Sequence, residues 1–275
     1  MIFQRLIWAA LGAALLVGSV QSGVQQWQAV PIILAAEAYE GQKAEAPVAP
    51  VAVASHVHAE GVAIAHEHEH DAAAQWAPAE GAERMFWTWL ANVLHAFSMA
   101  LLVFAVMGVC LWRGGALRSL PLALLVAASG WLSFHFWPSL GLPAEIPGMD
   151  AARLGSRQGW WLLAAGSAAL ACACLAGLGG ALRWAAAAAW LALPFVVGAP
   201  HISADPLAGF SGAAQAALRE LGTQFIWATT WVSLSFWACM GLACGAAFQR
   251  WLRPVLAAAF DRTSSPAPLG KAVNP

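Results

Sequence analysis

The sequence predicts an all-α integral membrane protein, a polytopic bundle of about six transmembrane helices with a long histidine-rich loop on its outer side. Two observations predict this class. Of the 275 residues, 60% are hydrophobic and only 10% are charged, which is too apolar for an ordinary soluble domain. The apolar residues also gather in runs of about 20, the length that an α-helix needs to cross the hydrocarbon core of a bilayer.

The first apolar run, from Leu6 to about Val24, follows a single arginine at the N-terminus. We expect it to form the first transmembrane helix, within residues 1–24, although a cleaved signal peptide has a similar charge and apolar core. Both interpretations place the next segment, residues 25–84, on the outer side of the membrane.

Within this outer segment, residues 31–40 are predicted to form a short interfacial helix with Pro31 in its first turn. Residues 41–81 are rich in alanine, proline and histidine, a composition that does not build a packed core. We therefore predict that they form a linker, which carries the histidine-rich segment 55–71.

Five further runs are expected to form the rest of the bundle, residues 85–250, and residues 251–275 are the expected cytoplasmic tail. The fourth of the five is short and contains Pro194. The predicted runs are 85–111, 117–137, 160–178, 182–198 and 224–248.

The distribution of charge supports six spans. If the N-terminus lies inside, thirteen of the 14 acidic residues fall outside, and only Asp261 falls inside. This arrangement obeys the positive-inside rule, and it predicts a multi-pass protein of the bacterial inner (cytoplasmic) membrane with both termini cytoplasmic. The acidic outer face would concentrate cations. Eight of the 13 basic residues then fall inside: Arg5, Arg113, Arg118, Arg183, Arg250, Arg253, Arg262 and Lys271.

Five of the eight histidines lie close together in the outer loop, among acidic residues. Neutral imidazole is the commonest side-chain ligand of borderline divalent metals, and carboxylates can complete the coordination shell. We predict that these histidines capture metal, although a solvated low-complexity loop or a metal buffer outside any transport path would show the same composition. The residues are His56, His58, His66, His68 and His70.

A polar stripe runs along the second predicted span. Thr88, Asn92, His95 and Met99 follow one another at spacings of four, three and four residues, so they share one face of a helix. Polar groups inside a bilayer tend to face a cavity or a partner helix. The stripe is therefore either a metal path, with Thr88 and Asn92 on the substrate path, or a helix-packing surface.

The remaining candidate ligands lie toward the outer side. His135 is near the outer end of the third span and His201 just after the fifth, so both could join His95 in a cluster, although histidines at helix ends are often structural. Glu37 and Glu40 would share a helical face as a second metal position, or simply form a solvated helix end.

The last run has two features that we attribute to helix packing. Gly241-Leu-Ala-Cys-Gly245 is a small-xxx-small motif that lets two transmembrane helices approach closely. Polar and sulfur-containing residues also recur at helical spacings. They are Thr229, Ser233, Met240 and Cys244.

The sequence gives no support for enzymatic activity. It has no Walker A motif and no Ser/His/Asp nucleophile set, and no paired carboxylates lie within apolar sequence. The near-zero net charge of −1 gives no reason to expect nucleic acid as a partner. We expect a non-enzyme without a tightly bound cofactor, in contact with the lipid bilayer and able to form a homo-oligomer.

Several segments together resemble the CbtA family of predicted cobalt transporter subunits. The resemblance implies a membrane component of a cobalt uptake system linked to cobalamin biosynthesis, acting beside a small histidine-bearing CbtB partner. That family is usually described with five spans, whereas the runs and charges here indicate six. Besides the histidine-rich loop, the matching segments are Pro31-Ile-Ile-Leu-Ala-Ala-Glu37-Ala-Tyr39-Glu40, Gly81-Ala-Glu83-Arg84, Gly141-Leu-Pro143-Ala-Glu145-Ile-Pro147-Gly148, Arg157-Gln158-Gly-Trp160-Trp161 and Gly198-Ala-Pro200-His201.

These observations lead to one hypothesis with two alternatives. The outer loop captures a divalent cation, Co²⁺ with Ni²⁺ and Zn²⁺ as alternatives, and passes it to ligands near His95, His135 and His201. In the first alternative the chain stores or presents metal for another transporter. In the second it is an oxidoreductase that binds haem between His95 and His135, since facing histidines on helices can ligate iron.

Overall fold

The computed structural model describes residues 2–43, 78–79 and 81–264, with side chains described up to residue 260. The five histidines of the predicted capture segment, residues 55–71, lie outside the described residues. Every regular element in the described part is helical. The main helices are α1 (Ile2–Gln28), α2 (Val30–Glu37), α3 (Ala82–Trp112), α4 (Ser119–Trp131), α6 (Leu154–Gly177), α7 (Leu182–Val197), α8 (Gly212–Ala247) and α9 (Arg253–Ser264).

Short elements connect or extend these helices. After α4, the chain forms one π-helical turn, η2 (Leu132–Phe136), and then α5 (Trp137–Ser139), which contains Pro138. A second π-helical turn, η3 (Phe248–Leu252), joins α8 to α9. The chain also makes a 3₁₀ turn, η1 (Glu40–Gln42), just before the residues that are not described.

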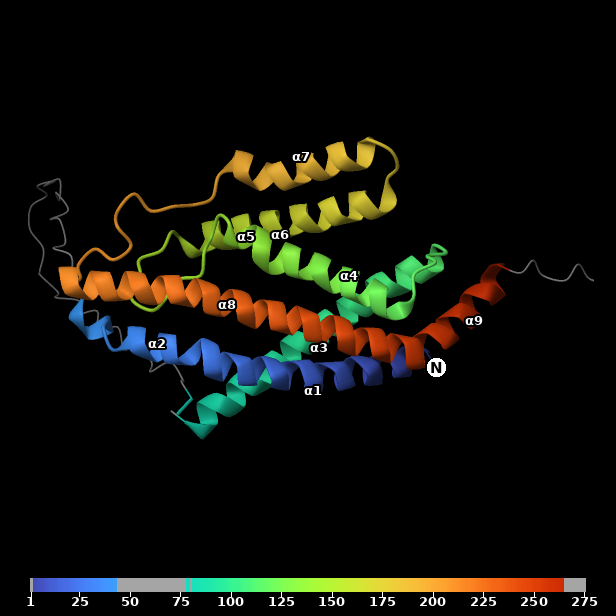
Figure 1. Ribbon diagram of the computed structural model, residues 1–275, viewed down its shortest axis with the longest axis horizontal. Coiled ribbons are helices and arrows are strands. Elements are labelled where there is room, and N and C mark those ends of the chain that lie inside the picture. Colours follow the sequence, from blue (N-terminus) through green and yellow to red (C-terminus); the bar gives the residue numbers. More distant parts are fainter. Residues whose placement is uncertain (1, 44–77, 80, 265–275) are drawn as a thin grey trace, which may run out of the picture.

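Five helical segments of the described chain are long and apolar enough to cross a membrane, and α7, predicted from the sequence as a short run, is a shorter apolar helix. Sixteen residues at 1.5 Å each rise about 24 Å, less than the ~30 Å of a bilayer core. The helix nevertheless returns the chain along α6 to the opposite end of the bundle (Figure 1). As a result, the N-terminal end of α1 and α9 lie at the same end of the molecule (Figure 1).

The N-terminal turns of α8 also differ from the prediction, which began this helix at residue 224. Helix α8 begins at Gly212, and the side chain of Ser211 caps it by accepting a hydrogen bond from the Ala214 amide. The alanine-rich sequence that follows is a strong helix former. These added turns carry α8 beyond the bundle, into contact with α2.

Helices α1, α3, α4 and α8 form the core of the bundle, and the α6–α7 hairpin lies along one side of it (Figure 1). The core is rich in alanine, which allows the helices to pack closely. At Gly18 of α1, an added Cβ would lie 2.7 Å from the Cα atom of Val93 in α3. Only glycine permits this approach between the two backbones.

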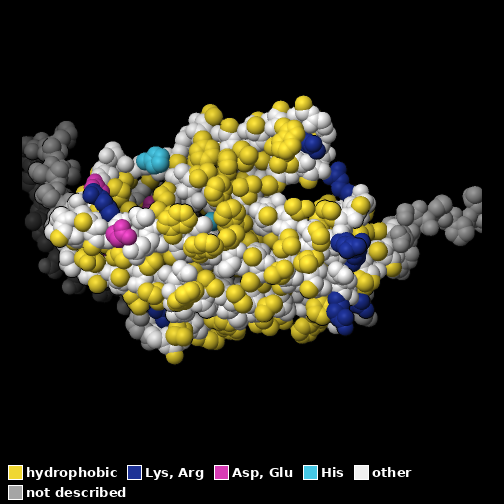
Figure 2. All heavy atoms as spheres, in the orientation of Figure 1, with side chains coloured by type: hydrophobic (Ala, Val, Ile, Leu, Met, Phe, Trp, Pro, Cys, Tyr) yellow, Lys and Arg dark blue, Asp and Glu magenta, His cyan; other side chains and the backbone are white. Residues whose placement is uncertain are grey.

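The two ends of the bundle carry opposite charge. We call the end at which α1 begins and α9 follows the basic end, and the opposite end the acidic end. On the face shown in Figure 2 the carboxylates lie toward the acidic end, whereas lysine and arginine side chains lie at both ends. Residues at the basic end are Arg5, Arg113, Arg118, Arg183, Arg250 and Arg253. The acidic end carries the carboxylates Glu37, Glu40, Glu83, Glu145, Asp150, Asp205 and Glu220 together with the basic residues Lys43, Arg84, Arg153, Arg157 and Arg219.

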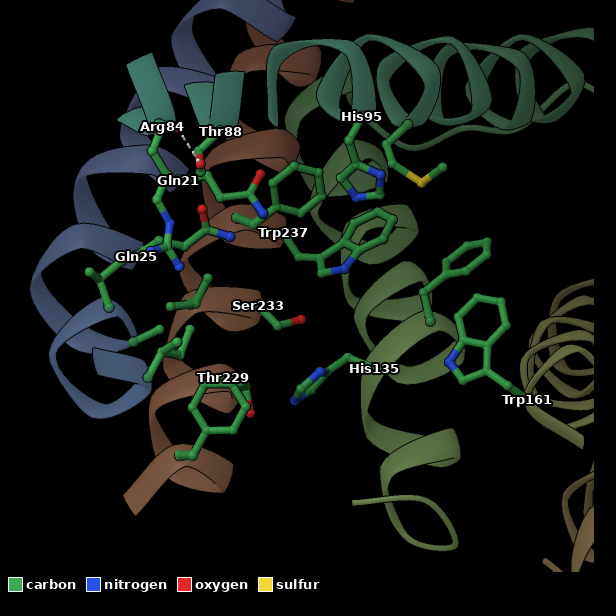
Figure 3. A pocket seen from close by; sticks show the side chains of 18 residues that line it. Gln21, Gln25, Arg84, Thr88, His95, His135, Trp161, Thr229, Ser233 and Trp237 are labelled. Carbon is green, nitrogen blue, oxygen red and sulfur yellow. Dashed lines mark hydrogen bonds between the residues drawn. The ribbon is translucent and has the colours of Figure 1, made fainter. Parts of the chain in front are cut away.

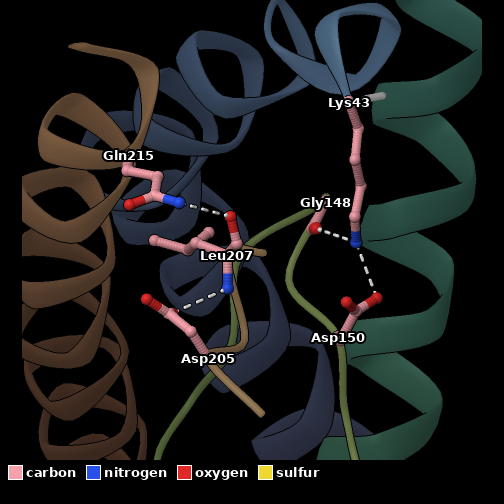
Figure 4. Close-up of polar contacts among 6 residues, drawn as sticks. All are labelled: Lys43, Gly148, Asp150, Asp205, Leu207 and Gln215. Atoms are coloured by element: carbon pink, nitrogen blue, oxygen red, sulfur yellow. Dashed lines mark hydrogen bonds and ion pairs between the residues drawn. The ribbon is translucent and has the colours of Figure 1, made fainter. Parts of the chain in front are cut away.

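A small second core closes the acidic end. It joins α2, the loops 140–153 and 198–211, and the start of α8 through Ala36, Ile146, Leu207, Phe210, Ala214 and Leu218. Ion pairs bind the same loops: Lys43 contacts Asp150 at 2.6 Å and also donates to the Gly148 carbonyl (Figure 4). We call this assembly the cap.

Candidate functional site

Between the helices, in the half of the bundle nearer the acidic end, lies a pocket of about 590 Å³. It is lined by α1, the start of α2, α3, η2, α6 and α8, so segments far apart in the sequence meet there. The lining residues labelled in Figure 3 are Gln21, Gln25, Arg84, Thr88, His95, His135, Trp161, Thr229, Ser233 and Trp237. The pocket therefore combines polar groups, including the charged Arg84, with an aromatic wall.

Three of the four members of the predicted α3 stripe line this pocket. Thr88, His95 and Met99 belong to its wall, and the His95 ring lies 5.2 Å from the ring of Phe236 in α8. Asn92 does not line it, because its buried amide donates hydrogen bonds of 2.9 and 2.6 Å to Ser22 and Gln25 in α1. Asn92 therefore joins α3 to α1, as the helix-packing interpretation of the stripe predicts.

His135 reaches the pocket from the π-helical turn η2. Its Nε2 atom lies 3.4 Å from the hydroxyl oxygen of Thr230 in α8, and its ring lies 6.1 Å from that of Trp131. A π-helical turn adds one residue to a helical turn, and such turns are frequent at functional sites. The turn ends two residues before Pro138, which has no amide hydrogen to continue a regular hydrogen-bond ladder.

His95 and His135 lie in one pocket but at different depths. They contact Phe236 and Thr230, six residues apart in α8, which corresponds to a rise of about 9 Å. Among the described residues, no group of three His, Cys, Asp or Glu side chains is placed to hold a metal ion. The pocket thus offers two separate imidazole positions, with hydroxyl oxygens and the Met99 thioether near them, and no preformed multidentate cage.

His201 is not part of this pocket. It is exposed on the loop after α7, where it lines a second pocket of about 320 Å³ between the two cap loops and α8. The expectation that His201 would lie in one cluster with His95 and His135 is therefore wrong. Helix α7 ends before this loop, and the loop folds into the cap rather than into the bundle.

The two glutamates of the predicted second metal position also differ from each other. Glu37 forms an ion pair with Arg84 at 3.2 Å, so its carboxylate has a charged partner without a metal. Glu40 lies in the exposed turn η1. Neither side chain lines the pocket that contains the two histidines.

Several pocket residues were missed by the sequence interpretation. Gln21 and Gln25 stand four residues apart on α1, so helical spacing of polar residues within an apolar run was an available signal. Thr229 and Ser233 on α8 show the same spacing, which the sequence analysis attributed to helix packing, and they also line the pocket. No such signal marks Trp161 and Trp237. Aromatic residues are common in transmembrane helices, and only the tertiary arrangement shows which ones face a cavity.

The segments that carried the family resemblance pair with one another in the structure. The Arg157 guanidinium contacts the Glu145 carboxylate at 2.5 Å, and the Trp160 indole donates to the Pro194 carbonyl at 2.9 Å. The Trp160 ring also packs on Gly141, where an added Cβ would lie 2.2 Å from it. These contacts join the cap loop, α6 and α7 at the acidic end.

The fold and this pocket define a class: a polytopic α-helical membrane protein with a polar pocket inside its bundle. Comparison with protein families identifies the particular one. The model of the CbtA family, described as "probable cobalt transporter subunit", matches residues 3–249, and the chain belongs to that family. Comparisons with curated proteins and with solved structures give no match.

Proposed function

We propose that this chain is the membrane subunit that moves a divalent metal ion, Co²⁺, from the acidic end of the bundle toward the basic end through the pocket between α1, α3, η2 and α8. The observation that carries the proposal is the placement of two histidines from different helices, His95 and His135, in one pocket inside the helical bundle. Histidine is costly inside a bilayer, and two side chains converging on a cavity support a function for both.

The chemistry of the lining suits a transient site. Neutral imidazoles bind borderline divalent metals well, and hydroxyl oxygens and a thioether add weaker ligands. Because His95 and His135 occupy different depths, an ion held by one must exchange part of its shell to reach the other. Incomplete protein coordination, with water in the remaining positions, allows that exchange, whereas a closed cage would retain the ion.

The charge distribution supports the direction of movement. Among the described residues the carboxylates lie at the acidic end, where they outnumber the basic side chains, whereas the basic end carries arginines, so cations would concentrate at the acidic end. By the positive-inside rule the basic end is cytoplasmic, so both ends of the chain lie in the cytoplasm and the ion moves inward across the bacterial inner membrane. The segment 55–71, with His56, His58, His66, His68 and His70, would collect metal at the acidic end.

The family description names a subunit, which implies a further subunit in the working transporter. We propose that this partner is a small histidine-bearing CbtB-type membrane protein. We place Glu40 and His201, both at the acidic end, among the outer ligands that receive metal before it enters the pocket. Glu37 could contribute only when its ion pair with Arg84 opens.

Uptake of radiolabelled cobalt tests the pocket directly. Cells expressing the chain, with and without the partner, are compared for wild type, His95→Ala and His135→Ala. We expect each substitution to reduce initial uptake at least tenfold, the order of effect of losing one ligand interaction of about 1.4 kcal/mol. Uptake that needs the partner but not these histidines would favour a chain that only presents metal.

A matched control lies on the same helix. Ser98, between His95 and Met99, is exposed and its hydroxyl donates to the Leu94 carbonyl of its own helix. Ser98→Ala should leave uptake unchanged. If His95→Ala and His135→Ala behave like Ser98→Ala at equal protein levels, the proposed route is wrong.

The capture segment has a separate test. Imidazole binds metal only when it is deprotonated, so a peptide of residues 55–71 should bind Co²⁺ more weakly as the pH falls below about 6.5, the ordinary pKa of histidine. Isothermal titration at several pH values measures this. Deleting the segment from the full chain should raise the cobalt concentration needed for uptake without abolishing it, and pH-independent peptide binding would rule out capture by imidazole.

A further inference from the structure

Helices α4 and α8 pack closely on the basic side of the pocket. Gly245 and Gly241 of α8 face α4, and an added Cβ would lie 3.1 Å from the Leu120 Cα atom at the first position and 3.3 Å from the Leu124 Cα atom at the second. We call this contact the α4–α8 seam. It confirms the packing predicted from the small-xxx-small motif and leaves no passage between the two helices there.

One turn further toward the acidic end, the seam contains a large side chain. Trp237 lies against Gly130 of α4 so closely that a Cβ on that glycine would be 2.3 Å from the indole Cζ3 atom. The Trp237 ring is only 5% exposed, and it stacks on Phe134 with ring centroids 5.9 Å apart and an interplanar angle of 10°. Only glycine, which has no Cβ, leaves room for this ring at position 130.

Trp237 lies between two groups of residues that line the pocket. The pocket is lined by residues 225–237 of α8, so Trp237 is the lining residue of that helix nearest the basic end. In Figure 3 its indole lies between the side chain of His95 and those of Ser233 and His135. Further along α8 toward the basic end, Met240 and Cys244 are fully buried in the core.

We propose that Trp237 is the gate of this pocket, with its indole closing the route toward the basic end and Gly130 serving as its seat. While the ring is stacked on Phe134, the indole separates Ser233 and His135 from His95 and the basic side. A change of side-chain rotamer that lifts the ring from Gly130 would join the pocket to the basic side. The identity of the ion that passes rests on the proposed function, whereas the closure itself follows from packing.

The gate can be tested by accessibility, without any metal. Ser233 lines the pocket beside Trp237, so Ser233→Cys serves as a reporter in the full chain. A membrane-impermeant thiol reagent is added to the membrane side that carries the C-terminal end of α9. The same protein with Ser233 intact gives the background from the five native cysteines.

With Trp237 present, we expect the reporter to react slowly from this side. Trp237→Ala should increase the labelling rate several-fold and Trp237→Phe less, because phenylalanine still fills part of the seat. Gly130→Ala should also increase it, since the added Cβ must displace the indole. Trp231→Ala is the matched control, because Trp231 is on the same helix but 56% exposed and outside the pocket.

Labelling of the Trp237→Ala protein no faster than that of the Trp231→Ala protein would overturn the proposal. If Trp237→Ala does not fold, as judged by gel filtration, the Trp237→Phe and Gly130→Ala proteins decide the question in the same way. The cobalt uptake test with His95 and His135 can fail while labelling succeeds, or the reverse. The failure of the gate is thus distinguishable from the failure of the proposed function.

Discussion

Two stretches of the same helix pair, α4 with its extension η2 and α8, differ sharply. Near the basic end, Gly241 and Gly245 bring the backbones into contact, whereas toward the acidic end His135 and Thr230 face each other across the edge of a pocket. The two stretches share the same helices and the same bilayer. Side-chain volume at the facing positions therefore decides where this bundle is closed and where it is open.

Helices α1 and α3 show the same contrast. At Gly18 the two backbones touch at Val93, while nearer the acidic end Asn92 reaches α1 through hydrogen bonds to Ser22 and Gln25. Gln25 also lines the pocket. Along this helix pair, glycine allows direct contact of the backbones, and one turn further toward the acidic end polar side chains join the two helices.

The largest effect is expected where the close packing is broken. Gly18→Ala places a Cβ 2.7 Å from the Val93 Cα atom, and since backbone must move to relieve the contact, we expect a loss of about 1–3 kcal/mol in unfolding free energy. Thermal unfolding in detergent measures this. Gly166→Ala in α6 is the control, because its Cβ meets nothing within 4 Å.

Equal stability of the Gly18→Ala and Gly166→Ala proteins would show that the α1–α3 contact is loose. The control itself should be neutral or slightly stabilising, since alanine has a higher helix propensity than glycine. The difference between the two variants therefore measures the cost of separating the backbones.

A smaller effect is expected where polar groups join the helices. Asn92→Leu removes both hydrogen bonds to α1, and interhelical hydrogen bonds in membranes contribute about 0.6 kcal/mol each and at most about 1.7. We expect a modest fall in the unfolding temperature, with cobalt uptake per folded molecule retained. His95→Leu, three residues away on the same helix, should show the opposite pattern, with uptake lost and stability little changed.

This pair of variants separates packing from function within one predicted stripe. If Asn92→Leu abolished uptake at normal stability, the amide would belong to the ion path rather than to the α1–α3 contact. If His95→Leu unfolded the protein, the imidazole would have a structural role.

The smallest effect concerns the cap. The Leu207 amide, which donates to Asp205, and the nearby Arg219 guanidinium lower the pKa of this carboxyl below its ordinary value. A lowered pKa stabilises the folded state at neutral pH, and that contribution is lost as the pH falls through the folded-state pKa. Asp205→Asn should therefore loosen the cap loop slightly at pH 7 and make progressively less difference below about pH 4.

Hydrogen exchange of the backbone amide of Leu207, expressed as the ratio of variant to wild type at each pH, measures this effect. The ion pair is exposed, so we expect only a small change. If the exchange ratio of variant to wild type does not change between pH 7 and pH 3.5, the carboxylate charge does not stabilise the loop.

Much of the fold follows from local properties of the sequence. Apolar runs about 20 residues long predicted the transmembrane segments, and the small-xxx-small motif at Gly241 predicted close packing. The prediction gave the bounds of α7 to within one residue but placed the start of α8 too late. Near Gly212, small and polar residues extend the helix outside an apolar run, where hydropathy gives no signal.

The candidate site was only partly predictable. Helical periodicity placed Thr88, His95 and Met99 on one face, and the pocket includes all three. It could not distinguish Asn92, because a polar side chain facing a neighbouring helix and one facing a cavity have the same spacing. Nor could it show that His135 shares the pocket while His201 lines another.

The sequence alone determined the membrane class, the helical content and the separation of charge between the two ends, because these depend on composition and on order along the chain. The tertiary structure alone decided which helices touch and which diverge, and hence where the pocket lies. The seat of Trp237 on Gly130 is the clearest case, because α4 and α8 are distant in sequence. A contact between two residues more than 100 positions apart depends on the packing of the whole bundle, and no local pattern records it.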